Sequence, residues 1–429
     1  MTPILPRRIA PLVAILVTVI SMALAQSRAV SDADVRRVDS SAILIDTHND
    51  ITSRTVDGYD IGKAKNDGHT NVTALKEGGV GAQFFAVYVS GDYVKGNRSA
   101  HRTLEMIDTV RHDIIGRYPN DFVLATTADD IERIHKQGKI AALMGIEGGH
   151  AIEDSLRLLR DYYDLGIRYM TLTHSNTNDW ADSSGDFDKA GIAHHNGLTD
   201  FGKQVVREMN RLGMLVDISH VADKTFWDAL GVSTAPIIAS HSSCRALADV
   251  PRNMTDDMLR AVGQYGGVVM VNFYSSFLSN DYRLAVKAQE PAIKQAVAEA
   301  KAKLQAEGKP VPNELAEQIE KSYTAKIPRP PLSVLIDHID HIAKIAGIDH
   351  VGLGSDFDGI PSSPEGMDSA ADLPKITQAL MARGYSAEDM HKILGGNFLR
   401  VFAKVQEVSK QLQAESRPRI TEKQPFDKK

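Results

Sequence analysis

Residues 140–149 read IAALMGIEGG, a nearly continuous apolar run that ends in a glutamate and two glycines. A run without polar alternation is typical of a parallel β-strand that is buried on both faces. Short apolar or β-branched runs of this kind recur along the chain, with helical patterns between them. They predict eight strands, at residues 42–46, 82–89, 140–146, 169–173, 214–218, 236–240, 267–273 and 350–354.

Eight alternating strand and helix units predict an α/β fold, namely a closed (β/α)8 barrel of the TIM type. A doubly wound open sheet is the alternative. Residues 281–327 are rich in Ala, Lys, Glu and Gln, and we expect them to form a helical insertion between strands seven and eight. We expect the barrel to span residues 26–408 and a polar C-terminal tail to occupy residues 409–429.

The N-terminus has the layout of a secretory signal peptide at residues 1–25. Arg7 and Arg8 precede an apolar run, which ends in the small-x-small pattern Ala23-Leu24-Ala25. An uncleaved membrane anchor is the alternative, but the apolar core is short for a spanning helix, which needs roughly 20 residues. We therefore expect an exported protein that is periplasmic or secreted.

Composition and charge exclude several classes of protein. Cys244 is the single cysteine, so we expect no internal disulfide, and we interpret it as a packed thiol rather than a nucleophile. The last residues are charged and form no hydrophobic tail, so we expect no GPI anchor. The net charge is −6 and no basic cluster stands out, so we expect no nucleic-acid partner.

Histidines or carboxylates follow six of the eight predicted strands. In a parallel barrel the carboxyl ends of the strands form one rim, which carries the catalytic groups. The sequence therefore predicts that these side chains converge. The strand ends concerned are Asp46-Thr47-His48-Asn49-Asp50, Gly145-Ile146-Glu147, Leu172-Thr173-His174, Asp217-Ile218-Ser219-His220, Ser240-His241 and Gly354-Ser355-Asp356-Phe357-Asp358.

So many charged groups on one rim predict a metal site, because buried charges need compensating cations. Histidine and carboxylate without thiolate suit Zn, Mn, Fe or Co. The supply of ligands exceeds what one tetrahedral ion needs, so two metals that share a bridging carboxylate use it better. The GxSxG, HExxH and Walker motifs are absent from the sequence. His338 and His341 lie one helical turn apart, and we interpret them as surface residues.

These strings, with Pro251-Arg252-Asn253 and the stretch from Gly396 to Phe402, are similar in order and spacing to those of the membrane (renal) dipeptidase family. The resemblance covers roughly residues 40 to 405. It implies a zinc-dependent dipeptidase of the amidohydrolase-like barrel group, in a bacterial-type exported form. It also implies a small dipeptide as substrate and a homodimer as the oligomeric state.

The resemblance further implies two zinc ions per chain and a role for each site residue. His48 and Asp50 would hold one ion, His220 and His241 the other, and Glu147 would bridge them. A hydroxide between the metals would attack the peptide carbonyl. Around it, His174 would contact the carbonyl oxygen, Asp356 would pass the proton to the leaving amine, and Arg252 would bind the free carboxylate of the substrate.

Other functions stay open at this point. One is a different metal-dependent amide hydrolase, acting on cell-wall peptides, N-acyl amino acids or lactams. Another is a non-catalytic binding protein on the same barrel, although such a protein should have lost Asp356 or a ligand and none is lost. The insertion at 281–327 could also reshape the mouth of the pocket, which bears on substrate preference.

Overall fold

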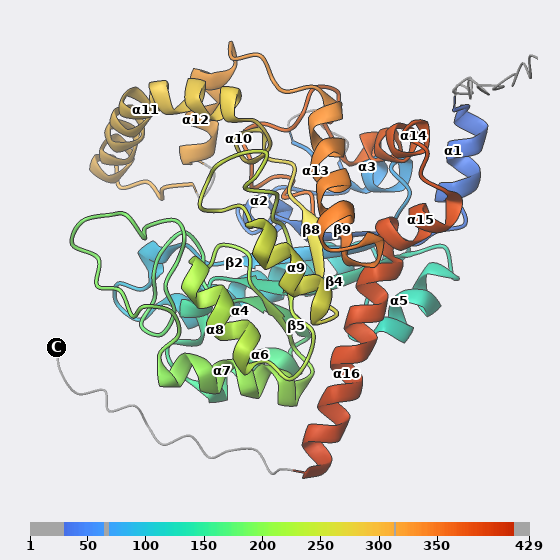
Figure 1. Cartoon of the computed structure of the whole chain (residues 1–429). Helices are drawn as coiled ribbons and strands as arrows, with labels where there is room; N and C mark the ends of the chain where they lie inside the picture. Colours follow the sequence, from blue (N-terminus) through green and yellow to red (C-terminus); the bar gives the residue numbers. More distant parts are fainter. Residues whose placement is uncertain (1–29, 64–67, 313–314, 416–429) are drawn as a thin grey trace, which may run out of the picture.

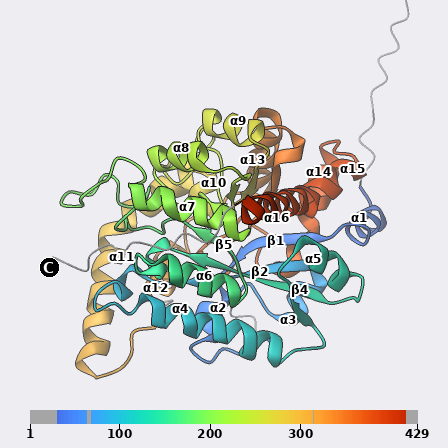
Figure 2. The same ribbon diagram turned by 90° about the horizontal axis from the view of Figure 1, so that it is seen from below.

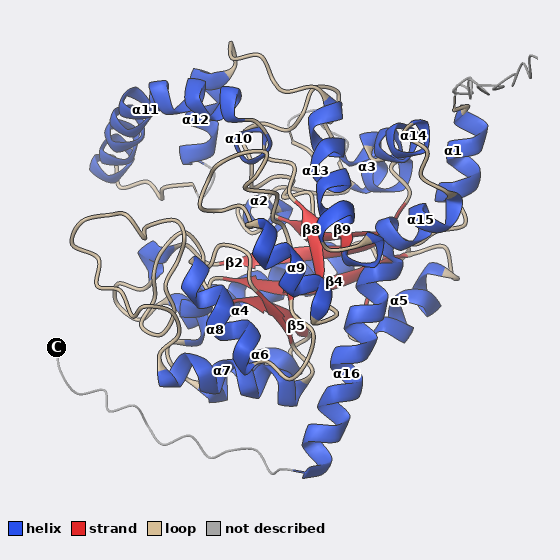
Figure 3. Cartoon of the chain, in the orientation of Figure 1, coloured by secondary structure: helices blue, strands red, loops and turns tan. Residues whose placement is uncertain are grey.

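A ring of parallel strands forms the centre of the chain (Figures 1 and 3). The structure is a computed structural model that describes residues 30–63, 68–312 and 315–415. The predicted signal peptide, 1–25, lies outside the described residues. Within the part that is described, no helix has the length and apolar character needed to cross a membrane.

The predicted barrel is confirmed. Eight strands pair in the ring order β2-β1-β9-β8-β7-β6-β5-β4, and a pairing of β2 with β4 closes it, so the open-sheet alternative is wrong. The strands of the chain are β1 (Leu44–Asn49), β2 (Val80–Tyr88), β3 (Phe122–Leu124), β4 (Ile140–Glu147), β5 (Ile167–Thr171), β6 (Leu215–Asp217), β7 (Ile238–Ala239), β8 (Val268–Val271) and β9 (Val351–Leu353).

Strand β3 is the one strand that the sequence did not predict. It pairs with the beginning of β4, where Phe122 lies opposite Ile140, and β5 pairs with β4 only from Met144 onward. Strand β3 therefore occupies the edge of β4 below the start of β5 and lies outside the ring of eight. Three residues are too short for an apolar run to be distinguished from loop.

Helices cover the outside of the ring and connect its strands (Figure 1). Several begin at a side-chain cap: Thr127, Thr199 and Thr255 accept hydrogen bonds from the first turns of α5, α7 and α9. The helices are α1 (Asp32–Asp39), α2 (Ile51–Thr55), α3 (Val72–Glu77), α4 (Ser99–Asp108), α5 (Ala128–His135), α6 (Leu156–Asp164), α7 (Asp200–Leu212), α8 (Asp223–Val232), α9 (Asp256–Gln264), α10 (Ser275–Leu278), α11 (Asn280–Ala306), α12 (Leu315–Thr324), α13 (Leu332–Ile345), α14 (Pro374–Ala382), α15 (Ala387–His391) and α16 (Asn397–Glu415).

The interior of the ring is filled by side chains from alternate strand positions, and helix α16 closes its amino-terminal end. Ile45, Leu143 and Tyr169 belong to one buried cluster with Phe398 and Phe402 of α16. The helix continues to Glu415, so residues 409–415 of the predicted tail are helical. Because side chains fill the amino-terminal part of the barrel, a functional site can lie only at the carboxyl-terminal rim.

The predicted insertion consists of α11 and α12, which lie between β8 and β9, the seventh and eighth strands of the ring. Helix α11 is mostly exposed, and only Tyr282 and Ile293 on it are buried. Figures 1 and 2 show the two helices together at one side of the barrel. Tyr274, just after β8, donates a hydrogen bond of 2.6 Å to Glu320 on α12, which ties the insertion to the rim.

Candidate metal centre

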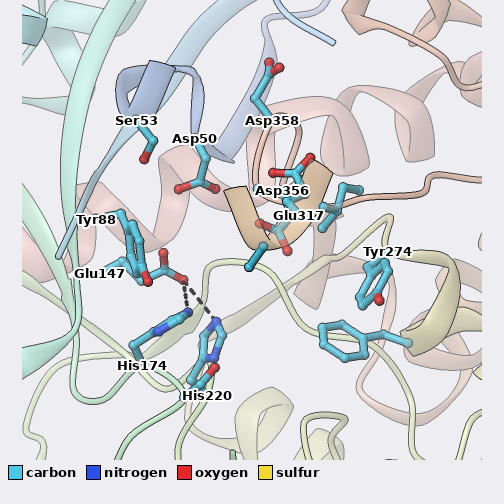
Figure 4. Close-up of a pocket in the computed structure, with 15 residues that line it drawn as sticks. Asp50, Ser53, Tyr88, Glu147, His174, His220, Tyr274, Glu317, Asp356 and Asp358 are labelled. Atoms are coloured by element: carbon cyan, nitrogen blue, oxygen red, sulfur yellow. Dashed lines mark ion pairs between the residues drawn. The ribbon is translucent and has the colours of Figure 1, made fainter. Parts of the chain in front are cut away.

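The seven histidines and carboxylates that the sequence singled out for the site meet at the carboxyl-terminal rim of the barrel. They come from the carboxyl ends of six strands of the ring, with His48 and Asp50 both at the end of β1, so the convergence depends on closure of the barrel. Most of them line a pocket of about 280 Å³, whose side chains are drawn in Figure 4. The seven residues are His48, Asp50, Glu147, His174, His220, His241 and Asp356.

Glu147 lies at the centre of the group. Its Oε1 is 3.0 Å from Nε2 of His220 and 3.3 Å from Nε2 of His241. Its other oxygen, Oε2, is 3.6 Å from Nε2 of His48. Figure 4 shows the carboxylate directed toward His174 and His220. One carboxylate therefore faces two separate sets of ligand atoms with its two oxygens.

His48 and Asp50 form the second set. Nε2 of His48 lies 3.2 Å from Oδ2 of Asp50 and 4.0 Å from Oδ1 of Asp356. Nε2 of His48 and Oδ2 of Asp50 are both buried, and neither has a hydrogen-bond partner among the described residues. Buried polar atoms are normally paired. Unpaired atoms that face each other at this distance fit a cation placed between them.

Further hydrogen-bond partners orient two of the candidate ligand histidines, His241 and His48. Nδ1 of His241 lies 2.8 Å from Oγ of Ser240, whose hydroxyl donates to Asp217 at 2.6 Å. Because a hydroxyl has one hydrogen, Nδ1–H of His241 is the donor to Ser240, which leaves Nε2 as a free ligand. Nδ1 of His48 similarly shares a hydrogen bond of 2.7 Å with the hydroxyl of Tyr169.

Tyr169 reaches His48 because Gly145 leaves room for its ring. A Cβ atom at position 145 would lie 2.0 Å from Cζ of Tyr169. Sequence reasoning missed this pair. Both residues lie inside predicted strands, and the sequence carries no signal of which positions face each other across the barrel.

Two buried aspartates join neighbouring strands directly below the site. Asp46 accepts hydrogen bonds from the amide and the hydroxyl of Ser355, both at 2.7 Å. Asp217 accepts the amide of Ser240 at 2.8 Å and its hydroxyl at 2.6 Å. In each case the residue after the serine is a site residue, Asp356 or His241. The two aspartates, which the sequence placed on the rim with the others, thus support the site rather than enter it.

The surroundings of Glu147 and Asp356 shift the pKa values of these two carboxyl groups in opposite directions. Burial raises the pKa of Glu147, but His48, His174 and the other surrounding imidazoles outweigh it and hold the pKa well below its usual value. For Asp356, burial together with the Asp50 and Glu147 carboxylates raises the pKa well above its usual range. Without a cation, negative charge is therefore concentrated on Glu147 and disfavoured on Asp356.

His174 lies at the edge of this group and faces the pocket. Its side chain is 22% exposed, and its Nε2 is 4.0 Å from Oε1 of Glu147. The ring packs edge-on against Tyr88, which also lines the pocket. Burial lowers the pKa of His174, so the ring is neutral near pH 7 and can donate or accept one hydrogen bond.

Arg252 is buried behind the wall of the pocket and is not among the described residues that line it. Its guanidinium donates to Oγ of Ser242 and to the carbonyl of His241, both at 2.7 Å. The guanidinium also lies 5.5 Å from the ring centre of Phe277, which does line the pocket. Burial lowers the pKa of Arg252 to about 10, so the group keeps its positive charge near neutrality.

The histidines outside the site include one error of interpretation. His338 is fully buried, not on the surface. His341 is partly exposed and lies 2.7 Å from Asp256. Cys244 is a buried thiol whose pKa is raised by burial, in agreement with the interpretation as a packed residue. Asp358 turns away from the ligands and accepts a hydrogen bond of 3.0 Å from the amide of His69.

Comparison with known proteins now identifies the family. The model of the membrane dipeptidase family (peptidase family M19) matches residues 32–416. The chain belongs to the membrane dipeptidase family. The resemblance found in the sequence is confirmed, and this membrane dipeptidase is a metallopeptidase that hydrolyses dipeptides. The alternative of a non-catalytic binding protein is wrong.

Solved structures share the fold of this membrane dipeptidase. The probable dipeptidase PvdM from Pseudomonas aeruginosa is 24% identical with a TM-score of 0.73, over 88% of this chain and 98% of that one. A metallopeptidase from Rhodobacter sphaeroides, liganded with a phosphinate mimic of the dipeptide L-Ala-D-Ala, is 25% identical with a TM-score of 0.66. That match covers 85% of this chain and 99% of the other.

Proposed function

We propose that this dipeptidase works with two zinc ions per chain. His48 and Asp50 would hold one ion, His220 and His241 would hold the other, and Glu147 would serve both. The observation that carries the proposal is the position of Glu147, with Oε1 at 3.0 Å from His220 and Oε2 at 3.6 Å from His48. Nitrogen and oxygen ligands without thiolate suit zinc.

When bound, the ions would lower the pKa of a water molecule toward about 7 and polarise the peptide carbonyl. Asp356 then takes up the proton of the attacking water and delivers it to the leaving amine. Its Oδ2 accepts a hydrogen bond of 2.7 Å from Asn272, so Oδ1, which faces His48, carries the proton. His174 contacts the carbonyl oxygen as negative charge develops on it.

We also propose that Arg252 recognises the free carboxylate of the substrate. The residue supplies a buried positive charge directly behind Phe277 in the pocket wall, and its Nε has no hydrogen-bond partner among the described residues. A carboxylate placed on that side of the pocket gains charge-assisted interactions that an amide lacks. This interaction would restrict the enzyme to substrates that end one residue beyond the scissile bond.

A substrate panel tests the proposed function. Purified protein is loaded with zinc and offered L-L and L-D dipeptides, N-acyl amino acids, cell-wall peptides and lactams. We expect dipeptides to be cleaved best, elemental analysis to give two zinc ions per chain, and a chelator to abolish activity. Cleavage of N-acyl amino acids or lactams in preference to dipeptides would instead favour the other class of metal-dependent amide hydrolase.

The role of Arg252 is tested by comparing a good dipeptide with its C-terminal amide. We expect the amide to have a much lower kcat/KM in the wild type, and Arg252→Ala to narrow that gap. Because Arg252 also holds the carbonyl of His241, zinc content is measured in the variant as a control. A gap that stays unchanged in fully metallated Arg252→Ala would show that the carboxylate is read elsewhere.

We further propose that residues 1–25 are removed on export, so that the mature chain begins at Gln26 in the periplasm or outside the cell. The support is the basic and apolar pattern of the N-terminal sequence. N-terminal sequencing of the exported protein is the test, and a chain that still begins at Met1 would contradict the proposal.

A further inference from the structure

Tyr169, on β5, contacts the ring nitrogen of His48 that is turned away from the other candidate ligands. Its hydroxyl lies 2.7 Å from Nδ1, whereas Nε2 of the same ring lies 3.2 Å from Asp50 and 3.6 Å from Glu147. Tyr169 and His48 are both fully buried. The two ring nitrogens of His48 therefore face different surroundings, one the candidate metal centre and the other the phenol.

Neighbouring strands hold the phenol of Tyr169 in this position. Tyr169 pairs with Gly145 of β4, where a Cβ atom would lie 2.0 Å from Cζ of the phenol ring. The ring also packs against Phe84 of β2, with ring centres 5.1 Å apart, in the same buried cluster. Because core side chains and a neighbouring strand enclose the ring, its hydroxyl has a defined position beside His48, as a residue that orients a ligand requires.

The chemistry of imidazole determines which atom donates when His48 binds a metal. A neutral imidazole carries one proton, and the nitrogen that binds the metal must be free of it. If Nε2 is the ligand atom, Nδ1 carries the proton and donates it to the oxygen of Tyr169. A phenol oxygen can accept a hydrogen bond, whereas a phenyl ring offers no such oxygen. Loss of the hydroxyl would leave the Nδ1–H group buried without this acceptor, which is unfavourable.

Resting on the proposed two-zinc site, we propose that Tyr169 is a positioning residue for the ion at His48 and Asp50. It holds His48 in the tautomer and ring orientation that zinc needs, and it thereby raises the affinity for this ion. Its effect is confined to one ion, because the other is held by different histidines, His220 and His241. Changes to such outer partners typically alter metal affinity by about 10- to 100-fold.

The test compares the stepwise zinc dissociation constants of wild type and Tyr169→Phe, measured by competition with a chelator. The substitution removes one oxygen atom and keeps the ring against Phe84. We expect one zinc ion to bind about 10- to 100-fold more weakly and the other to bind as in wild type. Tyr162→Phe is the matched control, because it removes the hydroxyl of another buried tyrosine, which donates to the carbonyl of Ala151. It should change neither constant.

Two backgrounds distinguish a role at one ion from a general loss of packing. Asp50→Asn removes a ligand of the ion near His48, so Tyr169→Phe should not weaken the zinc that still binds in this background. His220→Asn removes a ligand of the other ion, and here Tyr169→Phe should weaken the remaining zinc by the full factor. Equal losses in both backgrounds, or no loss in either, would overturn the inference. A wild type that binds fewer than two zinc ions would instead contradict the proposed function.

Nuclear magnetic resonance of the zinc-loaded wild type gives a second measurement that does not depend on folding of the variant. We expect the Nδ1–H proton of His48 to be shifted downfield and protected from exchange by its hydrogen bond to Tyr169. A proton on Nε2 instead, or an Nδ1–H proton that exchanges freely with solvent, would contradict the inference.

Discussion

Asp356 is fixed through one of its carboxylate oxygens and directs the other toward the candidate ligands. The amide of Asn272 donates to Oδ2, while Oδ1 faces His48 at 4.0 Å. Its backbone has φ +62°, a left-handed conformation that is costly for a residue other than glycine. His220, a proposed zinc ligand, has φ +67°. Strained backbone at two site residues places these side chains where an ordinary strand end would not.

Replacement of Asp356 by Asn should separate metal binding from catalysis. The amide keeps the size of the side chain but cannot carry the proton, so we expect kcat to fall by about 10²- to 10⁴-fold. The zinc content should stay close to that of the wild type. Steady-state kinetics and elemental analysis of the same preparation make the measurement.

Asp358→Asn is the control for this variant, because Asp358 lies two residues on and faces His69 and Arg54 instead of the ligands. We expect Asp358→Asn to lose much less of its kcat than Asp356→Asn. A fully metallated Asp356→Asn enzyme with a near-normal kcat would remove Asp356 from the mechanism.

At the residue scale, the sequence identified the candidate ligands because each follows a buried apolar run directly. A polar side chain at the end of a buried strand is costly to bury, so His48, Glu147 and His220 stand out as candidates for function. Tyr169 and Gly145 could not be found this way, since their role arises from packing across the barrel. The burial of His338 also depends on distant segments that cover its helix.

Helix α13 is joined to two other segments through His338. Its Nδ1 accepts the backbone amide of Cys244 at 3.0 Å, and its Nε2 lies 3.0 Å from the carbonyl of Leu278. Because Nδ1 accepts, Nε2–H is the donor to Leu278, and the ring is neutral. One imidazole thus connects α13, the end of α10 and the loop after β7.

The stability of the protein should depend on pH through His338. Burial lowers its pKa to about 4, below the value of about 6.5 in an unfolded chain. Between these values the unfolded state binds the proton and the folded state does not. This contribution to the free energy of unfolding is therefore complete above pH 6.5 and is lost progressively as the pH falls toward 4.

His338→Gln removes this titration and leaves at least one backbone partner poorly paired. We expect the variant to be about 1–3 kcal/mol less stable than wild type at pH 8, and the difference to shrink at pH 5. Urea unfolding of the zinc-free proteins at both pH values provides the measurement. A difference that is the same at pH 8 and pH 5 would show that folding does not lower the pKa of His338.

At the element scale, the eight strands and the helical insertion were predictable, because each depends on a local pattern of apolar or helix-forming residues. Strand β3 was not, since three residues carry no pattern. The direction of α12 was not predictable either. It is set by the contact between Tyr274 and Glu320, which are far apart in the sequence.

The molecule as a whole concentrates buried carboxylates at one end of the barrel. Asp50, Glu147 and Asp356 are all buried around the same site. Without cations these groups oppose folding through their mutual repulsion and lost hydration. The bound metal therefore contributes to the stability of the entire barrel as well as to catalysis.

Removal of the metal should lower the melting temperature. A ligand present at 1,000 times its dissociation constant stabilises the folded state by about 4 kcal/mol per site. For a chain of this size we expect a shift of several degrees or more, reversed by added zinc. Differential scanning calorimetry with chelator and with graded zinc gives the measurement. An identical melting temperature in both conditions would contradict a metal site built into the fold.

The order of the strands around the ring has a consequence for the synthesis of the protein. The rings of His48 and His241 stack at 3.8 Å, yet β1 and β7 are separated in the barrel by β9 and β8, the last two strands of the chain. A growing polypeptide that has reached residue 241 already carries every proposed zinc ligand. Strands β1, β2, β4, β5, β6 and β7 already pair in one continuous sheet at that point, but the gap between β7 and β1 stays open until β8 and β9 have been added. We therefore expect the barrel to bring His48 against His241 only when translation is nearly complete, so a chain cut short before β8 should keep all the proposed ligands without the closed ring that brings them together.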